Sequence, residues 1–327
     1  MNGFPSYPDD FLNKLRQDDC FFIIGHISPD GDCLYSELAM QALLTEMGKV
    51  SYVANAGPFE RSEIAAQRSQ FLQHMPSNLK AKNPTVIVVD CSTPDRIGSF
   101  INEINGLSIM VIDHHQSGEP FGDYRFVFSE SPSTTLLIQH LFVQLGLKIT
   151  PNIAHLLFFG FATDSGFFKF LNAGQGTVLR MVADLVDAGV SPNEIYSEMS
   201  GGKELAYVQY LGKLIERTQA FFDGRVLCSY CYLSDNDKYN TNDKPSDALY
   251  TQLLSVEVVK AVMLFKEQPE GKTEVGFRST HKSNVDVGLL ASTFGGGGHK
   301  CASGLTVSMS IEEIREKLLA ELKKQLI

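Results

Sequence analysis

The sequence has no apolar run that approaches the roughly 18 residues needed to span a membrane. Its first residues, MNGFPSYPDD, also lack the basic and apolar regions of a signal peptide. We therefore expect a soluble protein that contacts no membrane and resides in the cytoplasm.

Cysteine is scarce and scattered. The six cysteines mostly lie in apolar, strand-like segments, which favours buried thiols over a disulfide framework. Cys228 and Cys231 are three apart in one such segment and should point to opposite faces of a strand. Because no second pair accompanies them, a zinc knuckle is disfavoured.

Basic charge is also in short supply. The chain has 28 Lys and Arg against 38 Asp and Glu, and its formal net charge is −10. This balance argues against a protein that tracks along nucleic acid by neutralising phosphates. A short phosphate ligand stays compatible with the charge if metal cations supply the missing positive charge.

The length of 327 residues predicts two domains. The first two thirds alternate short Val- and Ile-rich runs with helical patterns, which predicts a doubly wound α/β domain whose ligands bind at the carboxyl ends of parallel strands. The expected strands are 20–25, 49–55, 85–90 and 107–113, and the expected helices are 34–48, 60–75, 133–146, 151–166 and 176–190.

We place the first domain at 1–195, a helical linker at 196–222 and a smaller α+β domain at 223–327. Within the second domain the pattern predicts a hairpin that turns near Asp223 and Gly224. Strands at 256–268 and 272–280, a helix at 246–254 and a last helix at 310–326 should complete it. The last helix opens with Ser310-x-x-Glu313, a capping box.

Potential metal ligands follow the predicted strands. The turn HISPDGD (26–32) needs only Pro29 and Gly31 to reverse the chain, so its histidine and two aspartates call for a further explanation. Other apolar segments end in Asp90, in Asp113-His114-His115 and in Asp164. One such aspartate alone is usually a helix N-cap, but strand ends in this architecture converge on one crevice. Oxygen ligands mixed with imidazoles suit manganese, magnesium or zinc, and paired ions of this kind hydrolyse phosphate esters.

These residues, in this order and setting, resemble the four motifs of the DHH phosphoesterase superfamily. GGGGHKCASG (295–304) is similar to the glycine-rich signature of the first type of DHH-associated domain. The longer stretch 277–304 resembles the two-domain members that degrade very short RNA and remove the 3′-phosphate from adenosine 3′,5′-bisphosphate (pAp).

The resemblance implies two divalent ions, with manganese as the expected metal and magnesium or cobalt left open. One ion would be held by His26, Asp30 and Asp90, and the other by Asp32, Asp90, His114 and Asp164. His115 would face the substrate phosphate, while Asp113 would orient an imidazole. The resemblance also implies a catalytic cleft between the domains, and it leaves the oligomeric state open, a homodimer included.

The second domain should hold a phosphate that is not cleaved. Four consecutive glycines, 295–298, leave a bare backbone whose N–H groups can approach an anion. The expected contacts are Arg278, Gly296, Gly297, Gly298, His299, Lys300 and Ser303, with His281 and Lys282 as additions.

Three points stay open in the sequence. Tyr35 either narrows the site or packs in the core. Phe167, Phe168 and Phe170 either stack a nucleobase or belong to the core. The expected substrates are RNA of about two to five nucleotides and pAp, with cyclic di-AMP or its linear product pApA as the alternative. A DHH-type pyrophosphatase, a RecJ-type exonuclease and a module without catalysis are less consistent with the motifs.

Overall fold

The computed structural model spans residues 1–327 and describes all of them except 1–2, 92, 117, 242–243, 281 and 327. The chain forms two compact units, Met1–Gly202 and Lys203–Ile327. Within the described ranges, no helix combines the length and the apolar character needed to cross a bilayer.

The first unit is built on a parallel sheet of five strands in the order β2-β1-β3-β4-β5. The strands are β1 (Cys20–Ile24), β2 (Val50–Ala54), β3 (Thr85–Val89), β4 (Ile109–Asp113) and β5 (Tyr124–Val127). This order is that of a doubly wound fold, which confirms the predicted fold class. Its topological switch point lies between β1 and β3, where ligands bind in such folds.

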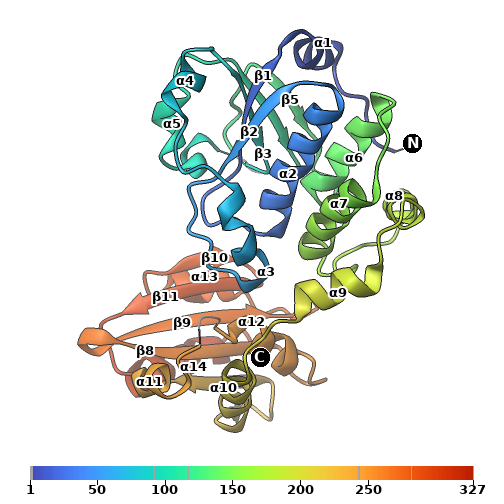
Figure 1. The fold of residues 1–327 in the computed structure, drawn as a ribbon. Helices are drawn as coiled ribbons and strands as arrows, with labels where there is room; N and C mark the ends of the chain where they lie inside the picture. The colour runs from blue at the N-terminus through green and yellow to red at the C-terminus, as the bar shows by residue number, and fades with distance from the viewer. Residues whose placement is uncertain (1–2, 92, 117, 242–243, 281, 327) are drawn as a thin grey trace. The chain divides into compact units, whose positions relative to one another are not determined.

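Helices cover both faces of this sheet (Figure 1). One core joins the sheet to α2 (Gly31–Glu46), α6 (Thr134–Gln144), α7 (Pro151–Asp164) and α8 (Gly176–Asp187), and another joins it to α4 (Ser77–Lys80) and α5 (Phe100–Glu103). The remaining helices of the unit are α1 (Asp9–Gln17), α3 (Ser62–Ala65) and α9 (Pro192–Ser200). The predicted strands and most of the predicted helices of this unit are therefore confirmed.

The prediction of a helix over 60–75 is wrong. The chain forms only α3 and a 3₁₀ turn, η1 (Ala66–Gln70), and then becomes extended at Phe71. Leu72 pairs with the edge of β2: its N–H donates to Val53 O at 3.0 Å, and its carbonyl accepts from Asn55 N at 3.1 Å. Leu72 therefore forms backbone hydrogen bonds with the edge of β2 in place of the bonds of a continuous helix.

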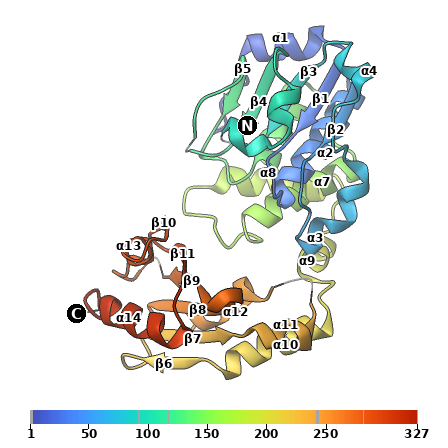
Figure 2. The same ribbon diagram turned by 90° about the vertical axis from the view of Figure 1, so that its left-hand side faces the viewer.

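The second unit contains a mixed sheet in the order β10-β11-β9-β8-β7-β6, with β10 and β6 at opposite edges (Figure 2). The strands are β6 (Gln219–Phe221), β7 (Val226–Cys231), β8 (Ala261–Gln268), β9 (Lys272–Ser279), β10 (Gly297–His299) and β11 (Ala302–Val307). One face packs on α13 (Val287–Ser292) and α14 (Ile311–Lys323), and the other on α10 (Leu205–Glu216), α11 (Leu233–Tyr239) and α12 (Ser246–Leu254).

Several local predictions for this unit are confirmed. β6 and β7 form the predicted hairpin, and Ser310 and Glu313 form the predicted capping box. Cys228 and Cys231 point into the cores on opposite faces of the sheet. All six cysteines lie in the described part of the chain, and no disulfide joins them.

The segment expected to link the domains, 196–222, spans the end of α9, all of α10 and β6. α9 packs on α7 of the first unit, whereas α10 packs on α12 and β7 of the second. The bounds of the linker stay a prediction, as does the cleft between the domains.

Candidate metal centre

The carboxyl ends of β1, β3 and β4 carry a cluster of acidic and imidazole side chains. These strands are neighbours in the first sheet, so their ends meet at the switch point between β1 and β3. The end of α7, which packs along α2, adds one more carboxylate. The cluster consists of His26, Asp30, Asp32, Asp90, Asp113, His114, His115 and Asp164.

The turn after β1 positions Asp30 and sets where α2 begins. Asp30 is the N-cap of α2, and its carboxylate accepts from Cys33 N at 3.1 Å. Gly31 allows α2 to begin against the end of α7, because a Cβ at Gly31 would lie 2.5 Å from the side chain of Thr163. The Pro-Asp-Gly-Asp spacing therefore brings α2 next to Asp164.

Asp90 lies at the centre of the cluster. Its Oδ2 is 3.5 Å from His26 Nε2, and its Oδ1 is 3.4 Å from His114 Nε2. The hydroxyl of Thr134 also donates to Oδ1 at 2.9 Å. Asp90 has a left-handed backbone with φ 54, which is costly for a residue other than glycine. A single buried carboxylate thus faces both imidazoles, as a ligand shared by two ions would.

The two imidazoles are oriented alike. Nδ1 of His26 lies 2.8 Å from Ile27 O, and Nδ1 of His114 lies 3.1 Å from Ser131 O. If each Nδ1–H donates to its backbone carbonyl, each Nε2 presents a lone pair to the carboxylates. His114 Nε2 is buried and has no hydrogen-bond partner among the described residues, although Asp164 Oδ2 is 3.2 Å away. Lone pairs facing carboxylates repel unless a cation lies between them, so this donor set fits divalent metal ions.

Charge in the cluster can also be balanced by protons. Burial lowers the pKa of His26, but Asp30 and Asp90 outweigh burial and raise it to about 10. Burial also lowers the pKa of His114, but Asp164 and Asp90 outweigh burial and raise this pKa to about 12. Burial, together with Asp90 and Asp164, raises the pKa of Asp32 well above its usual range. The cluster therefore requires added positive charge, which protons or metal ions can supply.

Two threonines that the sequence analysis did not consider hold Asp32. Asp32 Oδ2 accepts from Thr134 N at 2.6 Å, and Oδ1 accepts from Thr135 N at 3.1 Å and from its hydroxyl at 2.8 Å. These donors belong to the first turn of α6, where the helix dipole also favours a carboxylate. A Ser-Thr-Thr sequence at the start of a predicted helix is the signal that would have identified them.

His115 is held by a different carboxylate. Its Nδ1 lies 2.7 Å from Oδ1 of Asp113, a buried residue that ends β4. Asp113 raises the pKa of His115, and burial opposes the shift only in part. The structure thus brings Asp113 and His115 together, with Asp113 placed to orient the ring.

Two residues near the cluster do not take part in it. Cys33 Sγ lies within 4.8 Å of ligand atoms of His26 and Asp90, but it accepts from His26 N, and burial raises its pKa, which keeps it a thiol. Tyr35 packs in the core: its ring stacks on Phe159 at 4.1 Å, and its hydroxyl donates to Glu198 at 3.2 Å. The structure thus answers the question about Tyr35 in favour of packing.

The expected phosphate contacts of the second unit are divided between two faces of its sheet. Arg278 and His299 are each in register with Ala302 of β11, so their side chains share one face. The guanidinium of Arg278 lies 4.8 Å from the centroid of the Tyr250 ring. Ser303 faces the other way, and its hydroxyl donates to Val287 O at 2.6 Å. The structure therefore does not bring Ser303 together with Arg278 and His299.

The glycine run 295–298 is partly in a strand. Gly297, Gly298 and His299 form β10, which pairs with β11, and α13 packs against it. A Cβ at Gly298, whose φ is 141, would lie 2.6 Å from Ser303 Cα. Close packing of this hairpin therefore accounts for part of the glycine content. Lys300 is exposed at the hairpin turn, and His281 lies outside the described residues.

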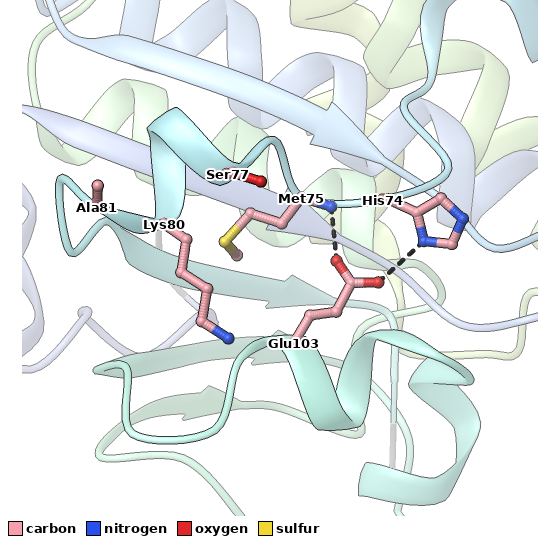
Figure 3. A pocket seen from close by; sticks show the side chains of 6 residues that line it. All are labelled: His74, Met75, Ser77, Lys80, Ala81 and Glu103. Atoms are coloured by element: carbon pink, nitrogen blue, oxygen red, sulfur yellow. Dashed lines mark hydrogen bonds and ion pairs between the residues drawn. The ribbon is translucent and has the colours of Figure 1, made fainter.

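A separate hollow of about 470 Å³ lies beside α4 and α5 (Figure 3). There Glu103 accepts from Met75 N at 2.6 Å and pairs with His74 Nδ1 at 3.1 Å. Its lining residues include none of the metal cluster, and its carboxylate is already engaged. This hollow is not part of the candidate site.

Comparison with known families identifies both domains. The model for the DHH family, N-terminal domain, matches residues 20–161, and the model for the DHHA1 domain matches residues 223–326. Together they cover more than half of the chain, which belongs to the DHH family. This confirms the resemblance drawn from the sequence, and the protein is accordingly a phosphoesterase, a hydrolase.

Similar proteins align over nearly the whole length. The "bifunctional oligoribonuclease and PAP phosphatase NrnA" of Thermus thermophilus is 24% identical, covering 93% of this chain and 90% of its own. The protein of the same name in Bacillus subtilis is 27% identical, covering 96% and 97%. A solved exopolyphosphatase-related protein from Bacteroides fragilis has a TM-score of 0.82 at 22% identity, covering 97% of this chain and 95% of its own. The structural likeness supports the fold.

Proposed function

We propose that the protein hydrolyses very short oligoribonucleotides to mononucleotides and pAp to AMP, with manganese as its metal. The observation that carries the proposal is the convergence of carboxylates on two imidazoles, one of which has a buried Nε2 that no described residue hydrogen-bonds. The names of the full-length relatives support the choice of substrates.

The ligands are proposed as two sets that share Asp90. The first set is His26, Asp30 and Asp90, and the second is Asp32, Asp90, His114 and Asp164. Divalent ions bound there would activate water and neutralise charge on the phosphate oxygens. Thr134 and Thr135 hold Asp90 and Asp32 in place, so the ligand positions are set before metal binds.

His115 is the proposed contact to the phosphate that is cleaved. Asp113 engages Nδ1, which leaves Nε2–H of the imidazolium to donate to a phosphate oxygen or to the leaving oxygen. Because Asp113 raises the pKa of His115, the protonated form persists above the ordinary value of 6.5. None of these contacts depends on what the leaving oxygen is attached to, so the same centre can hydrolyse a phosphomonoester and a phosphodiester.

Arg278 is the proposed contact to a second phosphate. Its guanidinium lies over Tyr250, which limits its freedom and leaves polar edges for an anion. His299, on the same face, would assist, and Gly296, Gly297, Gly298 and Lys300 would line the approach. pAp and a ribonucleotide dimer both carry a further phosphate that such a residue can bind.

The test is a panel of substrates incubated with manganese or with EDTA: pAp, a ribonucleotide dimer, cyclic di-AMP, pApA and pyrophosphate. The proposal expects metal-dependent turnover of pAp and the dimer, abolished by Asp164→Asn. Asp187→Asn, which changes an exposed carboxylate at the end of α8, is the matched control. Turnover of cyclic di-AMP or pApA alone would replace the proposal with the alternative activity, and turnover of pyrophosphate alone would refute both.

A further inference from the structure

The chain turns after Asp164, and of the three phenylalanines in this turn two are packed against the core and one is exposed. Phe167 and Phe168 pack against the first core, and the ring of Phe168 lies 5.3 Å from that of Phe161. Both have left-handed backbones, with φ 52 and 73, which cost about 1 kcal/mol or more each. Phe170 is instead 62% exposed. This strained turn thus exposes the ring of Phe170 six residues after Asp164, a proposed metal ligand.

Phe170 lines a cavity of about 550 Å³, and His114 and Asp164 line the same cavity. Its ring lies against the backbone of Gly166, where a Cβ would be 2.7 Å from Phe170 Cε2. The ring is therefore held in position from one side although it is exposed. The volume lies in the range of pockets for small ligands.

The rest of the cavity is polar, with Ser129, Glu130, Asn172 and Gln175 among its lining residues. Lys169 Nζ lies 5.4 Å from the centroid of the Phe170 ring. An exposed aromatic ring and polar groups, in one cavity with His114 and Asp164, together match one class of ligand, a nucleotide.

We propose that Phe170 stacks on the base of the nucleotide whose phosphate is cleaved, and that this cavity is the nucleoside subsite. The proposal rests on the proposed function, because it assumes that the phosphate lies at His114 and Asp164. Stacking accepts any base, since every base has a π face. The subsite therefore selects nucleotides without selecting sequence.

The kinetic test compares pAp with its abasic analogue, a tetrahydrofuran ring that carries the same two phosphates. Phe170→Ala should lower kcat/KM for pAp about 5- to 150-fold, the range for loss of one base–aromatic stack. It should cause no further loss on the abasic analogue, and Phe170→Tyr should retain most activity on pAp. Leu179→Ala, which changes a 52% exposed side chain on α8, is the matched control. Equal losses on both substrates, or no loss on pAp, would overturn the proposal.

A binding test separates this inference from the proposed function. The chain contains no tryptophan, so the fluorescence of 2-aminopurine riboside 5′-monophosphate can be followed without interference from it. Wild-type protein should quench this fluorescence, and Phe170→Ala should abolish the quenching. Quenching without turnover of any nucleotide would refute the reaction and leave the subsite standing. Normal turnover of pAp without quenching would refute the subsite and leave the reaction standing.

Discussion

Replacing Asp90 with asparagine should destabilise the metal-free protein, although this removes a carboxylate from an acidic cluster. Relief of repulsion would predict the opposite. The structure decides between these effects, because the nearest partners of Asp90 are two imidazoles at 3.4 and 3.5 Å and the hydroxyl of Thr134 at 2.9 Å. Both imidazoles lower the pKa of Asp90 against the effect of burial. Asp90 therefore acts as an anion between two cations.

The expected magnitude follows from burial. Asp90 is 2% exposed and His26 is 3% exposed, so solvent screens their interaction little. Removing one partner of a buried ion pair costs about 3–5 kcal/mol. At roughly 2–4 °C per kcal/mol for a unit of this size, the melting temperature should fall by about 6–20 °C.

The pH dependence gives this prediction a definite sign. The pKa of His26 is raised from 6.5 to about 10, so its stabilising pair is complete below pH 6.5 and is lost as the pH rises through about 10. The difference between wild type and Asp90→Asn should therefore shrink at alkaline pH. The assay is thermal unfolding in EDTA, followed by far-UV circular dichroism, with Asp187→Asn as the control. An Asp90→Asn protein as stable as wild type at pH 7 would refute the pairing.

Three further predictions concern metal, proton and substrate. Manganese affinity, measured by calorimetry, should rise with pH because His26 and His114 must each lose a proton before they bind the metal. The affinity should increase by up to about tenfold per pH unit for each proton released, and a Kd that stays constant with pH would contradict this. Asp113→Asn should lower the pKa of His115 in an NMR titration and move the alkaline limb of the pH–rate profile to lower pH, whereas an unchanged pKa would show that Asp113 does not control the ring. Arg278→Ala should raise KM for pAp by about one to two decades with little change in kcat, with Arg278→Lys as the conservative control; an unchanged KM would place Arg278 outside the site.

The ligand cluster could largely be predicted from sequence because all of its residues except Asp164, which ends α7, lie at or just after the ends of strands. An apolar run with few charges identifies a buried parallel strand, and parallel strands of one sheet end at a common edge. Asp90 and His114 therefore had to lie close together once β3 and β4 were recognised. The chemical identity of the side chains then indicated metal ions.

Long-range hydrogen bonds could not be predicted in this way. The bonds from Thr134 and Thr135 to Asp32 join residues more than 100 positions apart, and they depend on where α6 begins against the sheet. The failure of the helix at 60–75 has a similar origin, since pairing of Leu72 with β2 is a tertiary contact. The inward direction of Ser303 depends on the register of β10 and β11, which a run of glycines does not specify.

The length dependence of RNA hydrolysis tests the central claim most directly. With manganese, the protein should release mononucleotides from RNA of about two to five nucleotides much faster than from a 24-mer, and should convert pAp to AMP. A net charge of −10 means that each added nucleotide contributes more repulsion than binding. Degradation of the 24-mer as fast as a trimer would contradict the account and indicate a processive nuclease.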